Sequence, residues 1–501
     1  MGRKTAVTAW LGVSLVGLIV VIIVLGLGLF PRLTAAQEVI NDARPAFTAE
    51  RVAADRAAID MISVAANTVD PIMTPTGGVA AEWPKLRALV AQQSGLSVPQ
   101  LQARLDTNFP HTAGLLNAVP LSAVSAEIPK LVQFLSVTLK ISPTQVLAAI
   151  KKNFPHLYQA ITKLPTVTSG WNKVPKLTLT RFDGTPVTSV PQIRDYFSRD
   201  VIAMLERQQD NFRALDTKGG VRFLAPLLLI LGIIVIIFGA ALAYGAAKGI
   251  PREVDALGWI VVTVVGILVI SLVFALSLFP RLRGGHNLLN DARATFNAER
   301  VVGDRTAIDM VATVIDVADP IVTPQGGAAS EVPKLVAFVS QQAHLPRPVV
   351  LSMLKSKFPH TTGLLNAIPL SAVTAELPKL VVFVGKAVKI TPKQVLEVIR
   401  VNAPKLYQAI TNLPTVTSGW NKVPKLTLTR FDGTPVTTME GVSGYFSKDV
   451  VPVVERQQQN FERVDNPWPP LIVFPPLLVI VGGLVVLYGL FCYYLTRKAV
   501  L

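Results

Sequence analysis

Histidines that follow a Phe-Pro pair come nearest, by type and spacing, to a chemical site. His111, His156 and His360 each end the letters Phe-Pro-His, and three imidazoles at matching positions resemble a zinc ligand set. The fourth matching position holds Lys405, whose ammonium group has no lone pair to offer a metal. We therefore interpret the three histidines as helix-end residues and expect no metal site.

Adjacent acidic and basic residues form a second candidate. Asp55-Arg56 and Asp304-Arg305 occupy matching positions and would suit a catalytic acid with its partner. On a charged helix face such a pair is usually solvated, which is the interpretation we adopt. The chain also lacks a phosphate-binding loop, a nucleophile elbow and the His-Glu-x-x-His and Cys-x-x-Cys patterns. We expect no enzymatic activity and no cofactor.

The charge distribution is the clearest functional asymmetry. From Ile128 to Phe182 there are eight basic residues and no acidic one, and from Leu377 to Phe431 nine basic residues accompany Glu397 alone. Such stretches attract polyanions, although a solvated lysine-rich surface is the simpler alternative. The candidate residues are Lys130, Lys140, Lys151, Lys152, Lys163, Lys173, Lys176, Arg181, Lys379, Lys386, Lys389, Lys393, Arg400, Lys405, Lys422, Lys425 and Arg430.

Four long apolar stretches indicate which parts of the chain cross a membrane. Half of the 501 residues are hydrophobic, and the stretches Thr5–Pro31, Phe223–Ala247, Ala256–Pro280 and Asn466–Thr496 contain no charged side chain. Each exceeds the roughly 20 residues that a helix needs to cross a bilayer, so we predict four membrane helices. The first stretch is longer than the apolar part of a signal peptide, and we expect an uncleaved anchor.

Basic residues in the short segments predict the orientation. Arg3 and Lys4 precede the first predicted membrane helix, a middle loop carries basic residues at 248 and 252, and others follow the last helix. The positive-inside rule places all three segments in the cytoplasm of a multi-pass plasma-membrane protein. The predicted boundaries are a cytoplasmic tail at 1–8, membrane helix 9–31, extracytoplasmic domain 32–222, membrane helix 223–247, cytoplasmic loop 248–257, membrane helix 258–280, extracytoplasmic domain 281–468, membrane helix 469–495 and cytoplasmic tail 496–501.

The chain is an internal duplication. A shift of 249 residues aligns Leu29–Phe212 with Leu278–Phe461 without a gap, and well over half of the positions match. Because each copy contains an even number of crossings, the copies are parallel repeats. A finer repeat of 45 residues carries a Pro-Lys-Leu motif and a Phe-Pro-His-like motif, twice in each half.

Local patterns predict mainly helical external domains. Amphipathic spacing indicates one or two helices over 38–69, ended by Thr-Pro-Thr-Gly-Gly at 74–78, and Ser142 is suited to cap a short helix. Two identical 25-residue segments, 164–188 and 413–437, each contain Asp-Gly between β-prone residues, which predicts a short β-hairpin. The predicted fold is a mainly α membrane protein with two homologous, mostly helical extracytoplasmic domains.

These observations favour a non-enzymatic membrane scaffold, or an accessory subunit, of a bacterial cell-envelope lipid or wall system. Its expected partners are membrane lipids, including anionic ones, and other membrane proteins; nucleic acid is not expected outside the cytoplasm. The alternative is a lipid-binding or lipid-transfer protein that holds an acyl chain in its external domains. No charged side chain lies inside the predicted membrane helices, which disfavours a coupled transporter.

Overall fold

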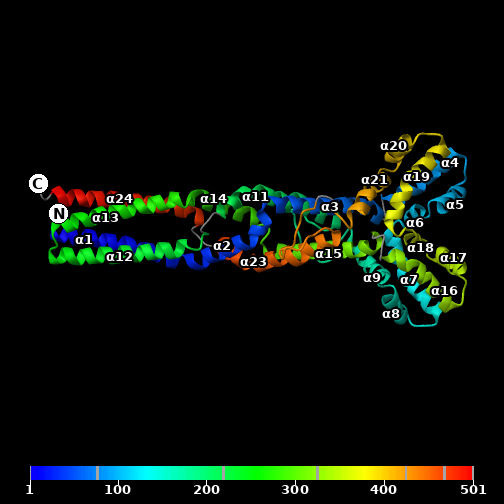
Figure 1. The fold of residues 1–501 in the computed structure, drawn as a ribbon, viewed down its shortest axis with the longest axis horizontal. Coiled ribbons are helices and arrows are strands. Elements are labelled where there is room, and N and C mark those ends of the chain that lie inside the picture. Colours follow the sequence, from blue (N-terminus) through cyan, green and yellow to red (C-terminus); the bar gives the residue numbers. More distant parts are fainter. Residues whose placement is uncertain are drawn as a thin grey trace. The chain divides into compact units, whose positions relative to one another are not determined.

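The structure, a computed structural model, describes residues 2–74, 78–216, 220–322, 327–423, 426–465 and 470–498. Within these ranges every regular element is a helix, and the helices run from α1 to α24 in chain order (Figure 1). The mainly α prediction is therefore confirmed for the part of the chain that is described.

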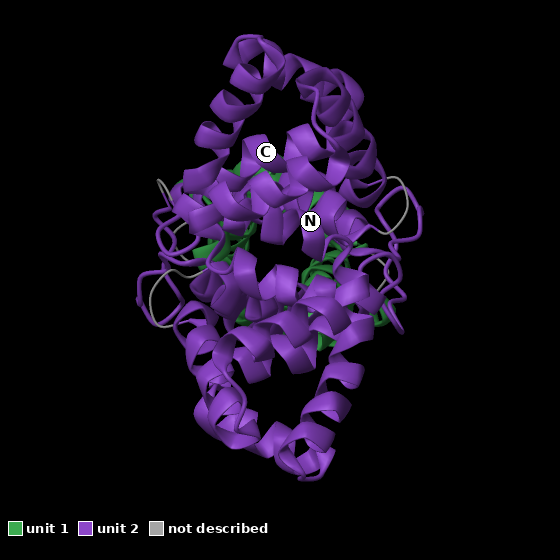
Figure 2. Ribbon diagram, turned by 90° about the vertical axis from the view of Figure 1, so that its right-hand side faces the viewer, with its two compact units in different colours: residues 1–49, 204–301, 453–501 green, residues 50–203, 302–452 purple. Residues whose placement is uncertain are grey.

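Contacts divide the chain into two compact units, coloured separately in Figure 2. Unit 1 comprises residues 1–49, 204–301 and 453–501, and unit 2 comprises residues 50–203 and 302–452. Each unit combines segments from both halves of the duplication. The domain boundaries predicted from the sequence lie at the ends of the predicted membrane helices, whereas these units are defined by contacts. The predicted boundaries therefore stay predictions.

Unit 1 contains four helices that are long and apolar enough to cross a membrane. They are α1 (Arg3–Gly26), α12 (Leu224–Lys248), α13 (Arg252–Ala275) and α24 (Phe474–Lys498, which a short 3-10 turn at Leu471–Val473 precedes). Two bent helix pairs in unit 2 also satisfy the test of length and composition, so the described residues contain four to six candidate spans. A multi-pass membrane protein is supported on these grounds.

Glycines bring the long helices together in two close pairs. A Cβ added to Gly17 of α1 would lie 2.7 Å from the carbonyl oxygen of Gly232 in α12. The matching change at Gly266 of α13 would place a Cβ 2.8 Å from the carbonyl oxygen of Gly482 in α24. Such close backbone approach is the usual role of small residues between membrane helices. The pairs α1/α12 and α13/α24 are thus equivalent structures from the two copies.

Shorter helices complete unit 1. Phe47 stacks on Phe212 with ring centroids 4.5 Å apart, and Phe296 stacks in the same way on Phe461. Arg44 is paired with Asp216 at 2.7 Å. These contacts join α2 (Leu29–Ala43), a 3-10 turn at Arg44–Phe47, α11 (Ile202–Leu215), α14 (Leu278–Ala292) and α23 (Val451–Asp465).

Unit 2 contains two lobes, and each lobe takes three helices from each half of the chain. Lobe A combines α7 (Leu121–Leu139), α8 (Pro143–Asn153) and α9 (Pro155–Gly170) with α16 (Ala328–Ala343), α17 (Arg347–Lys357) and α18 (Pro359–Ala367). Lobe B combines α4 (Val79–Ser94), α5 (Val98–Asn108) and α6 (Pro110–Ala118) with α19 (Leu370–Val388), α20 (Pro392–Asn402) and α21 (Pro404–Gly419). Figure 1 shows the two groups of helices as separate clusters.

The lobes meet where α6 crosses α18. A Cβ on Gly114 would lie 2.7 Å from the carbonyl oxygen of Gly363, and the reverse distance is also 2.7 Å. Only glycine allows the two backbones to approach this closely. The 45-residue repeat therefore corresponds to a three-helix building block that is used four times, with neighbours supplied by the other half.

Unit 2 also contains helices outside the two lobes. They are α3 (Ala49–Met73) and α15 (Ala298–Val322), followed later in each half by α10 (Val190–Tyr196) with a π-helical turn at Phe197–Val201, and α22 (Met439–Tyr445) with a π-helical turn at Phe446–Val450. Ala54 and Ala58 of α3 pack against Leu428 and Val436 of the second half. The helices expected over 38–69 are thus α2 and α3, but residues 75–77 of the predicted stop lie outside the described residues.

The predicted β-hairpins are not seen. The described residues around Asp183-Gly184 form a tight turn in which Gly184 has φ +85°, as the Asp-Gly signal requires. Only an isolated bridge between Thr180 and Pro186 follows, with no strand, and Thr429 and Pro435 repeat it. Hydrogen bonds from the Arg181 N–H to the Thr185 carbonyl oxygen and from the Val187 N–H to the Leu179 carbonyl oxygen flank the first bridge, so the pairing is confined to one residue pair. The turn was therefore placed correctly and the strands were not.

The capped helix at residue 142 is confirmed. The Ser142 hydroxyl accepts a hydrogen bond from the Gln145 backbone, and the Gln145 side chain accepts one from the Ser142 N–H. Pro143 occupies the first helical position, as expected where no N–H is needed. Thr391 and Gln394 form the same capping box in the second half.

Candidate anion-binding surface

The Pro-Lys-Leu motif and the Phe-Pro-His motif contact each other across the two halves. In every block a glutamate stands two residues before the Pro-Lys, and its carboxylate accepts hydrogen bonds from the first turn of a helix in the opposite half. Glu127 of α7 accepts from the backbone N–H of Thr361 at 2.7 Å and from its hydroxyl at 2.8 Å. Glu376 of α19 contacts Thr112 in the same way, at 2.8 and 2.9 Å.

The other two glutamates complete the set. Glu331 of α16 accepts from the Leu157 N–H at 2.8 Å, and Glu82 of α4 accepts from the Leu406 N–H at 2.9 Å. The unpaired N–H groups and the dipole of a helix N-terminus favour a negative charge at this position. Each carboxylate therefore acts as a helix cap supplied by the other half of the chain.

The histidines take part in the same junctions. His111 lies 2.6 Å from the Asn366 carbonyl oxygen and His360 lies 2.8 Å from that of Asn117, in each case through Nδ1. His156 Nδ1 lies 2.8 Å from Glu331. All three occupy the second position of a helix, so the interpretation as helix-end residues is confirmed. The described residues contain no cluster of three or more metal-ligating side chains.

Use of the glutamates as caps leaves the lobes strongly basic. The six helices of lobe A contain eight Lys or Arg residues and two acidic ones, Glu127 and Glu331, which are both caps. The helices of lobe B contain eight basic and four acidic residues, of which Glu82 and Glu376 are caps. Because the caps lie against helix N-termini, their charge is largely compensated there and does little to offset the surface lysines.

One exposed face of α7 and one of α19 gather basic residues at helical spacing. On α7 the exposed residues include Lys130 and Val137, of which 68% is accessible, and exposed Lys140 directly follows the helix. The exposed residues of α19 include Lys379, Val382 and Lys386, and exposed Lys389 directly follows that helix. We call these two sets the basic stripes. Each stripe combines lysines with an exposed valine.

Other predicted residues lie beside the stripes or already have acidic partners. Lys151, Lys152, Lys393 and Lys405 are exposed on α8, α20 and α21. Lys163 pairs with Asp316 at 2.5 Å and Arg181 pairs with Asp200 at 2.7 Å. The second half contains two further pairs, Arg430 with Asp449 at 2.6 Å and Arg400 with Glu397 at 2.5 Å.

The identical 25-residue segments contribute more to the core than to this surface. Trp171 is buried and its indole N–H donates to Asp70 at 2.8 Å, and Leu179 and Val187 are also buried. Lys173 and Lys176 are exposed in the segment between α9 and α10, and Lys422 is exposed in its copy. Lys425 lies outside the described residues. The structure thus separates these lysines from the helical stripes.

Sequence reasoning missed the basic residues that each lobe receives from the opposite half. In lobe A, Lys357 lies over the Phe134 ring at 4.7 Å, and Lys355 pairs with Asp106 of lobe B at 2.9 Å. The repeated Glu-x-Pro-Lys motif indicated that each glutamate has a binding partner in the fold. The sequence did not indicate which helix N-terminus is that partner.

Asp55 is buried and Arg56 is half-buried, so the interpretation of Asp55-Arg56 as a solvated pair was wrong. Only 4% of Asp55 is accessible, since α3 packs on the second half, with Arg51 and Tyr445 as polar neighbours. Burial raises the pKa of the Asp55 carboxyl to about 7, although both neighbours act in the opposite direction. Arg56 donates to the Ser198 carbonyl oxygen at 2.8 Å.

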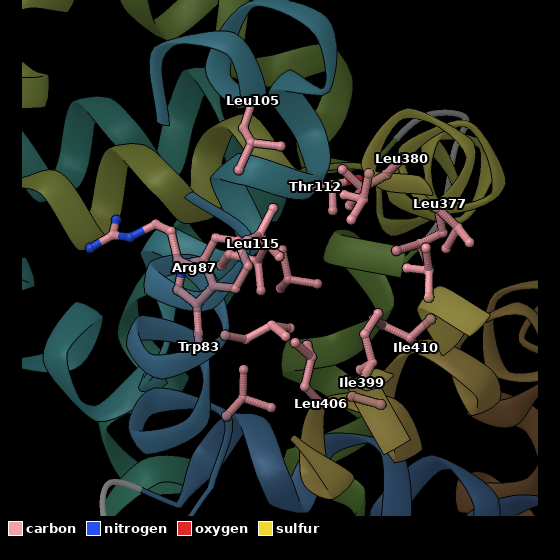
Figure 3. Close-up of a pocket in the computed structure, with 18 of the residues that line it drawn as sticks. Trp83, Arg87, Leu105, Thr112, Leu115, Leu377, Leu380, Ile399, Leu406 and Ile410 are labelled. Carbon is pink, nitrogen blue, oxygen red and sulfur yellow. The ribbon is translucent and has the colours of Figure 1, made fainter. Parts of the chain in front are cut away.

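Lobe B also contains an apolar cavity of about 80 Å³, between α4–α6 and α19–α21 (Figure 3). Trp83, Leu377 and Ile410 line it, and the Arg87 guanidinium points away to donate to Gln102 at 2.9 Å. This volume is well below the roughly 300–1,000 Å³ that is typical of ligand pockets. It is far smaller than an acyl chain.

Comparison of the chain with protein-family models, with curated proteins and with solved structures finds no match.

Proposed function

We propose that this protein is a non-enzymatic membrane scaffold whose two lobes bind an anionic lipid surface through the basic stripes. The observation that carries the proposal is the use of acidic residues in lobe A. Both of its carboxylates cap helices, while its lysines remain at the surface. Exposed Val137 and Val382 favour a lipid surface over a wall polymer, because a valine gains nothing from a polar polysaccharide.

The small size of the lobe B cavity favours this proposal over a lipid-transfer function. A protein that carries an acyl chain in its external part needs a cavity several times larger than 80 Å³. The stripes need no cavity, since they act on headgroups from outside.

A flotation experiment with full-length protein tests the proposal. Protein in neutral nanodiscs is mixed with vesicles of phosphatidylcholine alone or with added phosphatidylglycerol. Each basic residue near an anionic surface contributes about 1 kcal/mol at best, so replacing Lys130, Lys140, Lys379 and Lys386 with Gln should weaken binding by about 3 kcal/mol, roughly 100-fold. Raising salt from about 0.1 to 1 M shortens the screening length from about 10 to 3 Å and should release the wild-type protein.

A matched control removes four exposed positive charges outside the lobes. Arg199, Arg222, Arg283 and Lys448 are exposed, and their replacement with Gln changes the net charge by the same amount. This control should retain wild-type binding. Equal loss in both variants would mean that only overall charge matters, and unchanged binding by the stripe variant would remove the basis of the proposal.

The orientation belongs to the same proposal: both termini in the cytoplasm and both lobes outside it. Cysteine introduced at exposed Gln92 or Gln342, in a background where Cys492 is replaced with Ser, should react with an impermeant maleimide on intact cells. Reaction only after the membrane is opened would contradict this orientation.

A further inference from the structure

Unit 1 contains a large apolar cavity between its two pairs of long helices. Its volume is about 470 Å³, several times that of the cavity in lobe B. All four long helices line it, with Val16 from α1, Val235 from α12, Val265 from α13 and Val485 from α24 as representative residues. Apart from the Tyr488 hydroxyl, the lining side chains have no polar group, and that hydroxyl donates to the Ala9 carbonyl oxygen.

The cavity exists because the two helix pairs are joined at their ends and not between them. At one end Trp10 stacks on Trp259 with centroids 3.7 Å apart, and the Trp10 indole donates to Asp255 at 2.7 Å. Near the opposite end, residues including Val24 and Val273 belong to one shared hydrophobic cluster. Glycines hold each pair together internally, so the space lies between the pairs and not within them.

Water is a poor occupant of this space. A buried water needs two to four polar partners, and cavities lined only by aliphatic groups stay dry. An empty space would deprive the lining side chains of dispersion contacts on one side.

Hydrocarbon from a bilayer is the available occupant, because the rim of the cavity is part of the lipid-facing surface. Ile234, Val261 and Leu484 line the cavity and are also substantially exposed on helices whose length and composition suit a membrane. The volume lies within the range of roughly 300–1,000 Å³ that is typical of ligand pockets, so it is large enough for one lipid acyl chain.

We propose that this cavity binds a single acyl chain of a membrane lipid. The site uses hydrocarbon contacts in unit 1 and is independent of the charges on the lobes. Its failure in an experiment would therefore leave the proposed headgroup binding untouched, and the reverse also holds.

Photolabelling of full-length protein in nanodiscs tests the site. The probe is phosphatidylcholine with a diazirine at the end of one acyl chain, and labelled peptides are identified by mass spectrometry. Labelling should concentrate on the lining residues of α1 and α13 and exceed that of outward-facing Leu15 and Val264. Even labelling around each helix would indicate ordinary lipid contact and would overturn the proposal.

A pair of matched variants sharpens the experiment. Val16 and Val265 occupy equivalent positions in the two copies and line the cavity, so Val16→Phe with Val265→Phe fills the space from both sides. Leu15 and Val264 are the neighbouring, exposed residues of the same helices, and Leu15→Phe with Val264→Phe is the control. The first variant should lose roughly fivefold or more of the cavity labelling, because the rings occupy the chain's space, and the control should lose none.

Competition experiments on the wild-type protein test the site without any substitution. Unlabelled phosphatidylcholines with a series of saturated chain lengths compete with the probe. Because the helix pairs are joined at both ends of the cavity, competition should be strongest at one chain length and weaker for shorter and longer chains. Competition that is independent of chain length would contradict the proposed site.

Discussion

Replacing Glu127 with Gln should show how much the exchanged caps stabilise unit 2. The carboxylate accepts two short hydrogen bonds from Thr361, and its other oxygen lies 3.3 Å from the His360 N–H. Hydrogen bonds to a charged group contribute about 1.5–3 kcal/mol, against about 0.5–1.5 for neutral ones. The helix N-terminus adds about 0.3–1 kcal/mol for the charge.

The change to Gln keeps the size of the side chain but removes the charge and turns one acceptor into a donor. The free energy of unfolding should therefore fall by about 2 kcal/mol. In a domain of this size each kcal/mol moves the melting temperature by about 2 °C, so a shift of about 4 °C is expected. Circular dichroism of the full-length protein in detergent measures it.

Glu397→Gln is the matched control. Glu397 is exposed on α20 and bonds only to Arg400, three residues along the same helix, at 2.5 Å. Exposed pairs of this kind contribute about 0.3–0.5 kcal/mol, so the control should melt within about 1 °C of wild type. Equal effects of the two substitutions would refute the account of Glu127 as a cap between the halves.

Three further predictions concern unit 2. Gly114→Ala should destabilise it by about 1–3 kcal/mol in thermal melts, because the new Cβ would meet the Gly363 backbone, whereas Gly444→Ala, which meets nothing within 4 Å, should not. Gly184→Val should cost about 1 kcal/mol or more at φ +85°, measured in the same way. The pKa of Asp55 is raised to about 7, so the stability that the protonated carboxyl contributes is fully present below about pH 4 and is lost as the pH rises through 7. Asp55→Asn should reduce this loss of stability by about 2–4 kcal/mol, measured in melts across the pH range.

The sequence was sufficient for features that depend on local patterns. The four long helices follow from uninterrupted apolar stretches, and the helix after Ser142 follows from its cap and proline. The Asp183-Gly184 turn was also predictable, because its backbone requirement is local. The strands beside it were not, since the two arms pair only at an isolated bridge and β-prone residues alone do not determine how far such pairing extends.

The exchange between the halves could not be read from one chain. Two similar copies offer each Glu-x-Pro-Lys motif a matching helix start in its own half and another in the opposite half, with similar chemistry. The packing of α6 on α18 through Gly114 and Gly363 joins the halves. No periodicity in the sequence shows that these helices pack on the opposite half and not on their own. For the same reason Asp55 was expected to be solvated, although the second half covers it.

The basic stretches were predicted by composition, but the surface was only partly predicted. Counting charges along the chain did not separate Lys130, which is exposed on a stripe, from Lys163, which is paired with Asp316. Helical spacing on α7 and α19 distinguishes the stripes once those helices are known. Charge counting along the chain therefore did not distinguish the lysines of the stripes from basic residues that already have acidic partners.

The most direct measurement for the proposed function is the environment of Val137 when lipid is present. A nitroxide attached to Val137→Cys, in full-length protein with Cys492 replaced by Ser, reports its accessibility to oxygen and to a water-soluble nickel complex by electron paramagnetic resonance. Vesicles with phosphatidylglycerol should raise accessibility to oxygen and lower that to nickel, whereas vesicles of phosphatidylcholine alone should change neither. An unchanged, water-exposed label in the presence of anionic vesicles would contradict binding of the lobes to a lipid surface.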